Sequence, residues 1–502
     1  MPRFGFAIDN RACIGCHACT VACKAEHDVP IGVNRTWVKY IEKGTFPNTR
    51  RYFSVQRCNH CHDAPCVDIC PVTSLYRRPD GIVDFDGDRC IGCKACMQAC
   101  PYDALYLDPE SNTAAKCNYC THRVDAGYEP ACVIVCPVEA IVSGDLDDPD
   151  SRIGQLDRML NVQYPKVEKG TRPKLFYVGG ETAALDPAAA PPSENYLWSG
   201  NDGRITRDAL RLADREAEDE VRARRVYDVR AKPAPWGWMV SAYVTTKAVA
   251  TGVVIVSFIL FVMNHGSGIL PPRALGLSLI FLAITGALLV GDLKRPERFL
   301  YVLLRPQWKS WLVRGAYLIT LMALLGPLCG LISFLGAPRT AQLALGWPTS
   351  ILAAAVAAYT ALLFAQAKGR DYWQNPLLVV SMLIDALVAG AAALCLIGPL
   401  TREGSDITTR TLAVGTALLA ILLVAEMLPH HQTKNAELTG RIMTRGSLRW
   451  WFWGGVVVVG LVAPAAAILG GASTKLAGAL LLVGIACRNH VQVQAPQRVP
   501  LS

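Results

Sequence analysis

Apolar residues are distributed unevenly along the chain and are concentrated after about residue 236. Eight long apolar stretches follow one another there, at about residues 237–263, 275–291, 312–335, 349–366, 377–398, 411–428, 450–469 and 473–490. Most of them approach the roughly 20 residues that a helix needs to cross the hydrocarbon core of a bilayer. The pattern predicts eight transmembrane helices. The last is the weakest, and we expect Lys475 and Arg488 at its ends to extend toward lipid headgroups.

Basic residues predict the orientation of these helices. Eight helices return the chain to the side on which it entered the membrane, and eighteen Lys and Arg residues between Arg222 and Arg498 lie near the membrane on that side. The opposite side has five, namely Arg273, Arg339, Arg402, Arg410 and Lys475. The positive-inside rule then places both termini in the cytoplasm. The first residues show no basic head followed by an apolar run and no twin arginine, so we expect no export signal.

The first part of the chain contains sixteen of the 19 cysteines, all before residue 137. They form four quartets: Cys13, Cys16, Cys19 and Cys23; Cys58, Cys61, Cys66 and Cys70; Cys90, Cys93, Cys96 and Cys100; Cys117, Cys120, Cys132 and Cys136. The run C-x2-C-x2-C-x3-C-P is the ligand spacing of bacterial [4Fe-4S] ferredoxins, in which the fourth cysteine binds a different cluster from the first three. The quartets are therefore expected to work in pairs. A structural zinc site would not explain the repeated third and fourth cysteines, and a reducing cytoplasm disfavours disulfides.

The order of the quartets, the long gap in "CNYCTHRVDAGYEPACVIVCP" and the later "TRPKLFYVGG" resemble a known family. It comprises the four-cluster ferredoxin subunits of complex iron-sulfur molybdoenzymes, of the dimethyl sulfoxide, polysulfide and nitrite reductase type. The resemblance covers roughly the first 180 residues and implies four [4Fe-4S] clusters, with no three-iron variant. It also implies crossed ligand sets: Cys13, Cys16, Cys19 with Cys136; Cys117, Cys120, Cys132 with Cys23; Cys58, Cys61, Cys66 with Cys100; Cys90, Cys93, Cys96 with Cys70. Many members of this family work on the outer face of the membrane, and the orientation predicted here departs from that arrangement.

Several histidines lie close to these cysteines in the sequence. Because sulfur fills every expected ligand position, we interpret His17, His60 and His62 as surface or supporting residues rather than ligands.

The second half of the chain resembles the membrane subunit of polysulfide reductase, the NrfD family. The motifs that carry this resemblance are "WGWMVSAY", "GDLKRPERF", "SWLVRGAY" and "AYTALL". The family implies a quinone-reactive bundle without haem. The apolar stretches agree, because they contain no pair of histidines that could bind haem: His265, His430, His431 and His490 lie at or beyond their ends.

Ionisable residues within the apolar stretches indicate where chemistry takes place, because charge is costly inside a bilayer. They are Lys247, Asp292, Arg314, Asp385 and Glu426, and all are expected in the cytoplasmic half or near the middle of the membrane. A quinone site needs hydrogen-bond donors for the carbonyl oxygens and an acid-base route to water. We assign Tyr243 and Lys247, one helical turn apart, as donors and Asp292 as the proton carrier. Tyr359, mainly by resemblance, and Arg314 are expected to help bind the quinone.

Structural explanations stay open for each of these residues. Lys247 and Asp292 would also fit an ion pair, Asp292 would fit a turn before Pro296, and Arg314 would fit an anchor at a helix end. Asp385 and Glu426 would fit either a proton path toward the opposite face or polar contacts between helices. Cys329, Cys395 and Cys487, in the apolar stretches, are expected to be packing residues.

The predicted fold is an α+β, ferredoxin-like tandem dicluster domain followed by an all-α bundle of eight transmembrane helices. We expect the four-cluster domain at residues 1–180, a linker with a short charged helix at 181–235, the quinone-reactive membrane domain at 236–493 and a tail at 494–502. The net charge of +9 is explained by the membrane topology, so nucleic acid is not an expected partner.

These features predict an electron-transfer and membrane-anchor subunit of a respiratory complex in the plasma membrane. Electrons would pass through four clusters between a cytoplasmic catalytic partner and menaquinone or ubiquinone, with proton translocation as an additional possibility. The resemblance implies a molybdenum or tungsten pterin partner, with a nickel-iron hydrogenase as the alternative. An ion pump or transporter driven by a ferredoxin-like head is the competing hypothesis, although the helices show no two-fold repeat of broken segments.

Overall fold

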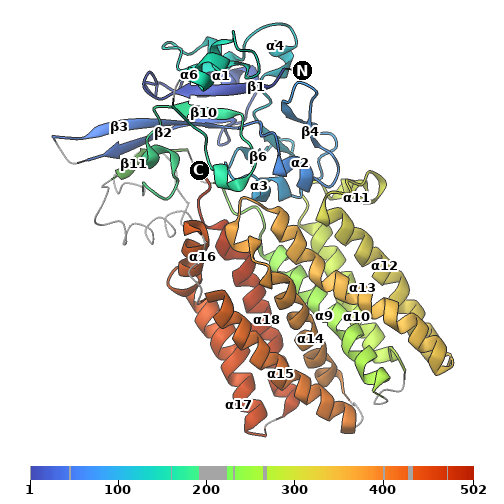
Figure 1. The fold of residues 1–502 in the computed structure, drawn as a ribbon. Helices are drawn as coiled ribbons and strands as arrows, with labels where there is room; N and C mark the ends of the chain where they lie inside the picture. Colours follow the sequence, from blue (N-terminus) through green and yellow to red (C-terminus); the bar gives the residue numbers. More distant parts are fainter. Residues whose placement is uncertain are drawn as a thin grey trace.

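The computed structural model describes residues 2–44, 47–159, 161–190, 223–229, 232–263, 268–398, 402–427, 433–471 and 473–502. Figure 1 shows two stacked parts, with the strands and short helices of the N-terminal part above a bundle of long helices. The expected charged helix lies outside the described residues, apart from its last residues at 223–225. His265, His430 and His431 also lie outside them.

The N-terminal part is built on a four-stranded sheet in the order β8-β1-β10-β9. Strand β1 (Phe4–Asp9) runs parallel to β10 (Leu175–Val178) and antiparallel to β8 (Ile141–Asp145). The short β9 (Val162–Gln163) pairs with β10, and helix α6 (Arg152–Met159) packs against β8. Because β1 and β10 come from the two ends of the predicted four-cluster domain, their pairing closes it at about residue 178.

The segments between β1 and β8 alternate short helices with small antiparallel pairs of strands. The helices are α1 (Ala18–Glu26), α2 (Pro65–Ile69), α3 (Ala95–Ala99), α4 (Thr121–Val124) and α5 (Ala131–Ile134). The strand pairs are β4 (Leu75–Arg77) with β5 (Val83–Phe85) and β6 (Leu105–Leu107) with β7 (Ala114–Lys116). This arrangement confirms the predicted α+β class.

A second sheet joins part of the expected linker to the N-terminal part. Strand β2 (Thr36–Lys43) pairs with β3 (Arg50–Arg57) and also with β11 (Ala223–Tyr227). Residues 223–227 are therefore folded onto this sheet and are not a free connection. Helix α7 (Thr182–Leu185), also in the expected linker, contacts both β2 and β3.

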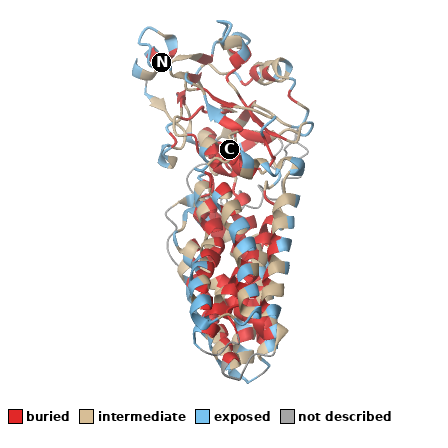
Figure 2. Ribbon diagram, turned by 90° about the vertical axis from the view of Figure 1, so that its right-hand side faces the viewer, coloured by how far each residue is buried: buried red, intermediate tan, exposed pale blue. Residues whose placement is uncertain are grey.

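The C-terminal part confirms the eight predicted membrane-spanning helices by length and composition. They are α9 (Trp238–Val262), α10 (Pro272–Gly291), α12 (Trp311–Phe334), α13 (Arg339–Gln366), α14 (Leu377–Ile397), α15 (Arg402–Met427), the π-helical η4 (Trp451–Val462) continued by α17 (Ala463–Leu469), and α18 (Thr474–Gln497). Figure 2 shows many exposed and half-buried positions along the long helices of the bundle. The exposed positions include large apolar side chains such as Leu324, Ile421 and Trp450. Lipid is the environment that suits such a surface.

Short elements and the C-terminal residues connect the two parts. The elements include α11 (Tyr301–Leu304), η2 (Pro296–Arg298), η3 (Asp371–Gln374) and α16 (Lys434–Thr444). Residues 494–502 were expected as a tail, but residues 494–497 form the buried end of α18, and Val499 and Leu501 beyond it are also buried. The buried Arg370 donates hydrogen bonds to the carbonyls of Pro496 and Val499 and to Gln98 on α3. The C-terminal residues thus hold α3 against the bundle.

Candidate functional site

The sixteen N-terminal cysteines carry free thiols, and most are buried. In all four quartets the residue before the second cysteine has a left-handed backbone: Gly15 (φ 71°), His60 (φ 45°), Gly92 (φ 69°) and Tyr119 (φ 66°). This turn folds the backbone over the first cysteine. The amides of His60 and Gly92 accordingly lie 3.4 Å from the sulfurs of Cys58 and Cys90, to which they donate hydrogen bonds. The same loop geometry is thus repeated four times.

The two outer quartets are adjacent in space. Burial raises the pKa of Cys13, and the neighbouring thiol of Cys136 raises it further. Burial also raises the pKa of Cys23, with added contributions from the thiols of Cys117 and Cys132. The fourth cysteine of each outer quartet therefore lies near the first cysteine of the other.

In the two inner quartets, too, thiols of one quartet lie near thiols of the other. Burial, followed by the thiols of Cys58 and Cys100, raises the pKa of Cys61. For Cys96, burial is again the main cause of a raised pKa, and the thiols of Cys93, Cys90 and Cys70 add to it. The thiols of the two inner quartets therefore lie close together, and the crossed ligand sets that the family resemblance implies stay a prediction.

These thiols fit iron-sulfur clusters better than single ions. Within the described ranges, no three Cys, His, Asp or Glu side chains converge closely enough to hold one metal ion. A [4Fe-4S] cluster binds each thiolate at a different iron, so its cage is wider than that of a single ion. Gathered thiols with raised pKa values need bound cations to stay ionised, and the irons of such a cluster supply that positive charge.

Positively charged and aromatic side chains surround the cysteines. Arg57 is 1% exposed, lies over the ring of Phe6 at 4.6 Å and donates from Nη1 to the sulfur of Cys132 at 3.1 Å. Its Nε and Nη2 have no partner in the described part of the chain. His27 Nε2 lies 3.1 Å from the sulfur of Cys120. The sequence did not single out either residue, because both face cysteines of other quartets.

The three histidines beside the quartets occupy different positions. His60 is buried and its Nδ1 accepts a hydrogen bond from the amide of Val83. His62 pairs with Asp63 at the surface, and His17 packs against Tyr40 and Tyr227.

A cavity of about 230 Å³ lies where the N-terminal part meets the bundle. The N-terminal part contributes Ile91 and Cys93 to its wall, so a thiol of the third quartet borders it directly. The bundle contributes Tyr243 from α9, Tyr359 from α13 and Asp292 from the end of α10. Most of the other lining side chains are apolar, including Val240, Leu289, Leu293, Val302, Leu312, Ala316, Ile319 and Leu363.

The loop "GDLKRPERF" fixes this contact between the two parts. The amides of Lys294 and Arg295 donate to the carbonyls of Gly92 and Ile91, at 3.3 and 3.2 Å. A Cβ atom at Gly92 would lie 2.6 Å from the Cβ of Lys294, so only glycine permits this approach. Trp236 adds a hydrogen bond from Nε1 to the carbonyl of Cys93 at 3.1 Å.

Asp292 and Lys247 do not form an ion pair with each other. Asp292 instead pairs with Lys94 of the third quartet loop, at 2.9 Å. Burial raises the pKa of this carboxyl, and Lys94 counteracts the rise. Lys247 lies behind the cavity wall, where it donates to the carbonyl of Ala357 and the hydroxyl of Thr360. Its ammonium lies 4.6 Å from the centre of the Tyr359 ring.

Arg314 does not reach the cavity. Its side chain is exposed, lies over the ring of Trp311 and donates from Nε to the carbonyl of Trp308 at 2.8 Å. These contacts agree with an anchor at the start of α12.

Three models of known protein families match the chain. The 4Fe-4S dicluster models match residues 12–75 and 49–146, and the polysulphide reductase NrfD model matches residues 229–493. The last match covers more than half of the chain. The protein belongs to the NrfD family. Its N-terminal part contains 4Fe-4S dicluster domains, and this NrfD-family protein is an integral membrane protein.

Several individual relatives are similar to somewhat more than a third of the chain. One subunit of the tetrathionate reductase of Salmonella typhimurium is 42% identical over 189 residues, which cover 37% of this chain and 76% of the relative. One polypeptide of the polysulfide reductase of Wolinella succinogenes is 40% identical over 189 residues, which cover 37% of this chain and 98% of the relative. Protein NrfC of Escherichia coli is 43% identical over 179 residues, which cover 35% of this chain and 80% of the relative. This chain therefore joins an iron-sulfur subunit and an NrfD-type subunit in one polypeptide.

The NrfD-type bundle also contains a buried charged group away from the first cavity. Arg488 on α18 donates from Nη1 to Asp385 on α14 and from Nη2 to Glu426 on α15, both at 2.9 Å. All three residues are at most 5% exposed. The expectation that Arg488 extends to lipid headgroups is wrong, because the two carboxylates hold it between the helices.

Proposed function

We propose that this protein transfers electrons between a catalytic partner subunit and membrane quinone, and that it anchors the partner to the membrane. The observation that carries the proposal is the position of Cys93. This cysteine belongs to an expected cluster ligand set and also borders the apolar cavity between the N-terminal part and the bundle. A lipid-soluble ring in that cavity would lie beside the cluster.

The sixteen cysteines would hold four [4Fe-4S] clusters in the crossed sets named above. When bound, such clusters take up and release electrons at potentials set by charge, hydrogen bonds and exposure. The protein contributes the hydrogen bonds to the sulfurs and the buried charge of Arg57.

The first cavity offers the groups that quinone chemistry requires. Tyr243, Tyr359 and Asp292 line this cavity. In our proposal the two hydroxyls would donate to the quinone carbonyl oxygens, and Asp292 would exchange protons. Lys247 acts indirectly in this proposal, because its contacts position α13 and the ring of Tyr359. We do not include Arg314 in the quinone site.

The catalytic partner would bind at the end of the iron-sulfur part where Cys16 is exposed. Four apolar side chains around this cysteine are also exposed, namely Ile14, Val21, Ile134 and Val135. They lie on or beside α1 and α5, which pack against each other. The relatives named above include subunits of tetrathionate and polysulfide reductases, so we propose a reductase-type partner, of the molybdenum or tungsten pterin class that the family resemblance implies.

The distribution of Lys and Arg supports a cytoplasmic position for the iron-sulfur part. Proton translocation coupled to quinone chemistry belongs to the same proposal, because ionisable residues are buried within the bundle.

The test uses two glycines of α10. Gly286 lines the first cavity and Gly276 does not, and a Cβ at either position meets open space. The full-length protein is purified, its clusters are reduced chemically, and their reoxidation by a short-chain menaquinone analogue is followed by stopped-flow absorbance. Gly286→Leu should slow reoxidation at least about tenfold, which corresponds to about 1.4 kcal/mol, and Gly276→Leu should leave it unchanged. Equal rates in both variants would refute the site.

A further inference from the structure

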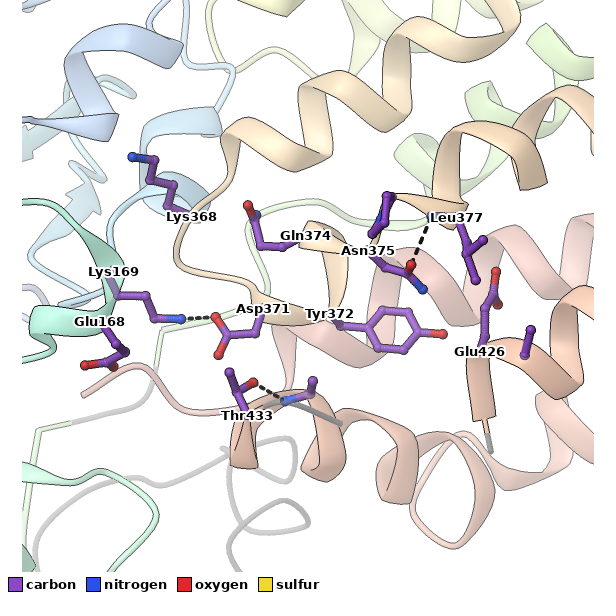
Figure 3. Close-up of a pocket in the computed structure, with 13 residues that line it drawn as sticks. Glu168, Lys169, Lys368, Asp371, Tyr372, Gln374, Asn375, Leu377, Glu426 and Thr433 are labelled. Carbon is purple, nitrogen blue, oxygen red and sulfur yellow. Dashed lines mark hydrogen bonds and ion pairs between the residues drawn. The ribbon is translucent and has the colours of Figure 1, made fainter. Parts of the chain in front are cut away.

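A second cavity lies on the iron-sulfur side of the bundle and has a volume of about 530 Å³. Figure 3 shows Glu168 and Lys169 of the N-terminal part on one side and Tyr372, Asn375 and Glu426 of the bundle on the other. Unlike the first cavity, it is lined by many charged and amide side chains. Glu168, Lys368 and Gln374 in its wall are exposed, so water can enter from the surface.

The inner end of this cavity leads to the buried charged group. Glu426 lines the cavity and also binds Arg488, which in turn binds Asp385. Leu377 lines the cavity at the start of α14, and Asp385 lies eight residues further along the same helix. Eight helical residues span about 12 Å, so the group extends from the cavity into the bundle.

The charges of this group do not balance. An arginine keeps its proton in proteins, so two ionised carboxylates beside one guanidinium leave a net charge of −1. A single negative charge among buried helices is costly. Binding one proton to either carboxylate removes that cost and leaves a neutral arginine-carboxylate pair.

Polar atoms without partners surround the same group. Asp385 Oδ2, Arg488 Nε, Ser381 Oγ and both side-chain polar atoms of Gln492 are buried and make no hydrogen bond within the described structure. Ser381 lies one turn before Asp385 on α14, and Gln492 lies one turn after Arg488 on α18. Native proteins rarely leave so many buried polar atoms together without water. Internal water between α14 and α18 would satisfy them and would carry protons.

We propose that Asp385, Arg488 and Glu426 form a proton-binding site that exchanges one proton with water in the second cavity. In the binding step a hydronium ion in the cavity gives its proton to a carboxylate oxygen and becomes water, and the site changes from a net charge of −1 to neutral. Release is the reverse step. Tyr372 of η3 also lies beside Glu426 and Arg488, and Glu168, Lys169, Lys368 and Asp371 line the cavity. This site goes beyond electron transfer and does not require the quinone proposal to hold.

The test measures the carboxyl stretching band by infrared difference spectroscopy during a pH titration of the full-length protein in lipid nanodiscs. The wild-type protein should show a protonated carboxyl band that shifts in heavy water. Glu426→Gln or Asp385→Asn should abolish it, because each leaves a neutral pair with no proton to exchange. Each variant also keeps Arg488 paired, so both should fold. The matched control is Glu437→Gln on α16, since Glu437 pairs with Arg441 at the surface and should not affect the band.

A second variant tests the route. Ala436 lines the cavity and has no ionisable side chain, so Ala436→Phe should narrow the cavity and slow the exchange of the band into heavy water. Absence of a protonated carboxyl band at every pH, or a band that persists in both carboxylate variants, would overturn the proposal. Unchanged exchange in Ala436→Phe would refute the cavity as the entrance. None of these measurements involves quinone. The quinone proposal is tested by the Gly286→Leu experiment, so the two proposals can fail independently.

Discussion

The two cavities at the boundary between the iron-sulfur part and the bundle differ in their linings. The first has a mostly apolar wall, and Cys93 borders it. The second is lined by many charged and amide side chains, including Glu426 at its inner end. Helix α9 carries lining residues of the first cavity, α14 carries a lining residue of the second, and the two helices pack against each other. In our two proposals, one bundle separates two kinds of transfer, with electrons passing at the first cavity and protons entering at the second.

The largest effect should come from removing the thiol that borders the first cavity. Cys93→Ala should abolish the cluster nearest the bundle and lower quinone reduction by about a hundredfold, or about 2.7 kcal/mol. Electron paramagnetic resonance and quinone reduction by the full-length protein measure both effects. The control is Cys329→Ser in α12, whose sulfur lies 3.1 Å from the hydroxyl of Thr349 and far from the quartets in the sequence. Unchanged quinone reduction in Cys93→Ala would contradict the proposal that electrons pass at the first cavity.

A tyrosine from each cavity gives a matched pair. Tyr359→Phe removes a hydroxyl from the first cavity and should lower quinone reduction about tenfold, because a buried donor to the carbonyl oxygen is lost. Tyr372→Phe removes a hydroxyl from the second cavity and should leave the rate unchanged. Steady-state kinetics with a quinone analogue measures both. Similar losses in the two variants would show that the cavities do not have separate roles.

A smaller effect is expected for Lys247, which acts through its neighbours. Lys247→Leu should slow quinol-linked turnover about three- to fivefold while dye-linked activity with the partner stays intact. The loss of its hydrogen bonds loosens the helix that carries Tyr359. Lys475→Leu, at the exposed start of α18, is the control. Equal loss of both activities would indicate a folding role for Lys247.

The smallest effect on electron transfer is expected from the second cavity itself. Glu426→Gln should change the rate of cluster reoxidation by quinone by less than about twofold. Asp292→Asn, in the first cavity, should change it more. The same stopped-flow experiment compares the two variants. A larger effect of Glu426→Gln than of Asp292→Asn would assign the quinone site to the second cavity instead of the first.

Sequence patterns predicted the repeated and periodic features of this protein. Each cysteine quartet and each apolar stretch lies within one continuous segment of the sequence. The quartet loops and the eight helices could therefore be predicted without knowing how distant segments pack. Tyr243, Tyr359 and Asp292 were predicted near one site, and the structure places all three around the first cavity.

Contacts between distant segments were not predictable in the same way. Asp292 pairs with Lys94, and Arg57 faces cysteines of other quartets; both contacts depend on how separate segments pack. Arg488 looked like the end of a weak membrane helix because its two carboxylates lie on other helices. Residues 494–502 looked like a tail because their acceptors for Arg370 are backbone carbonyls, which carry no sequence signal.

Photolabelling tests the central claim most directly. The reduced full-length protein would be illuminated with an azido-quinone, digested, and analysed by mass spectrometry. We predict labels on the peptides of α9, α10 and α12 that surround the first cavity, and loss of those labels in Gly286→Leu. Labels around Tyr372 and Glu426, or labels that persist unchanged in Gly286→Leu, would contradict it.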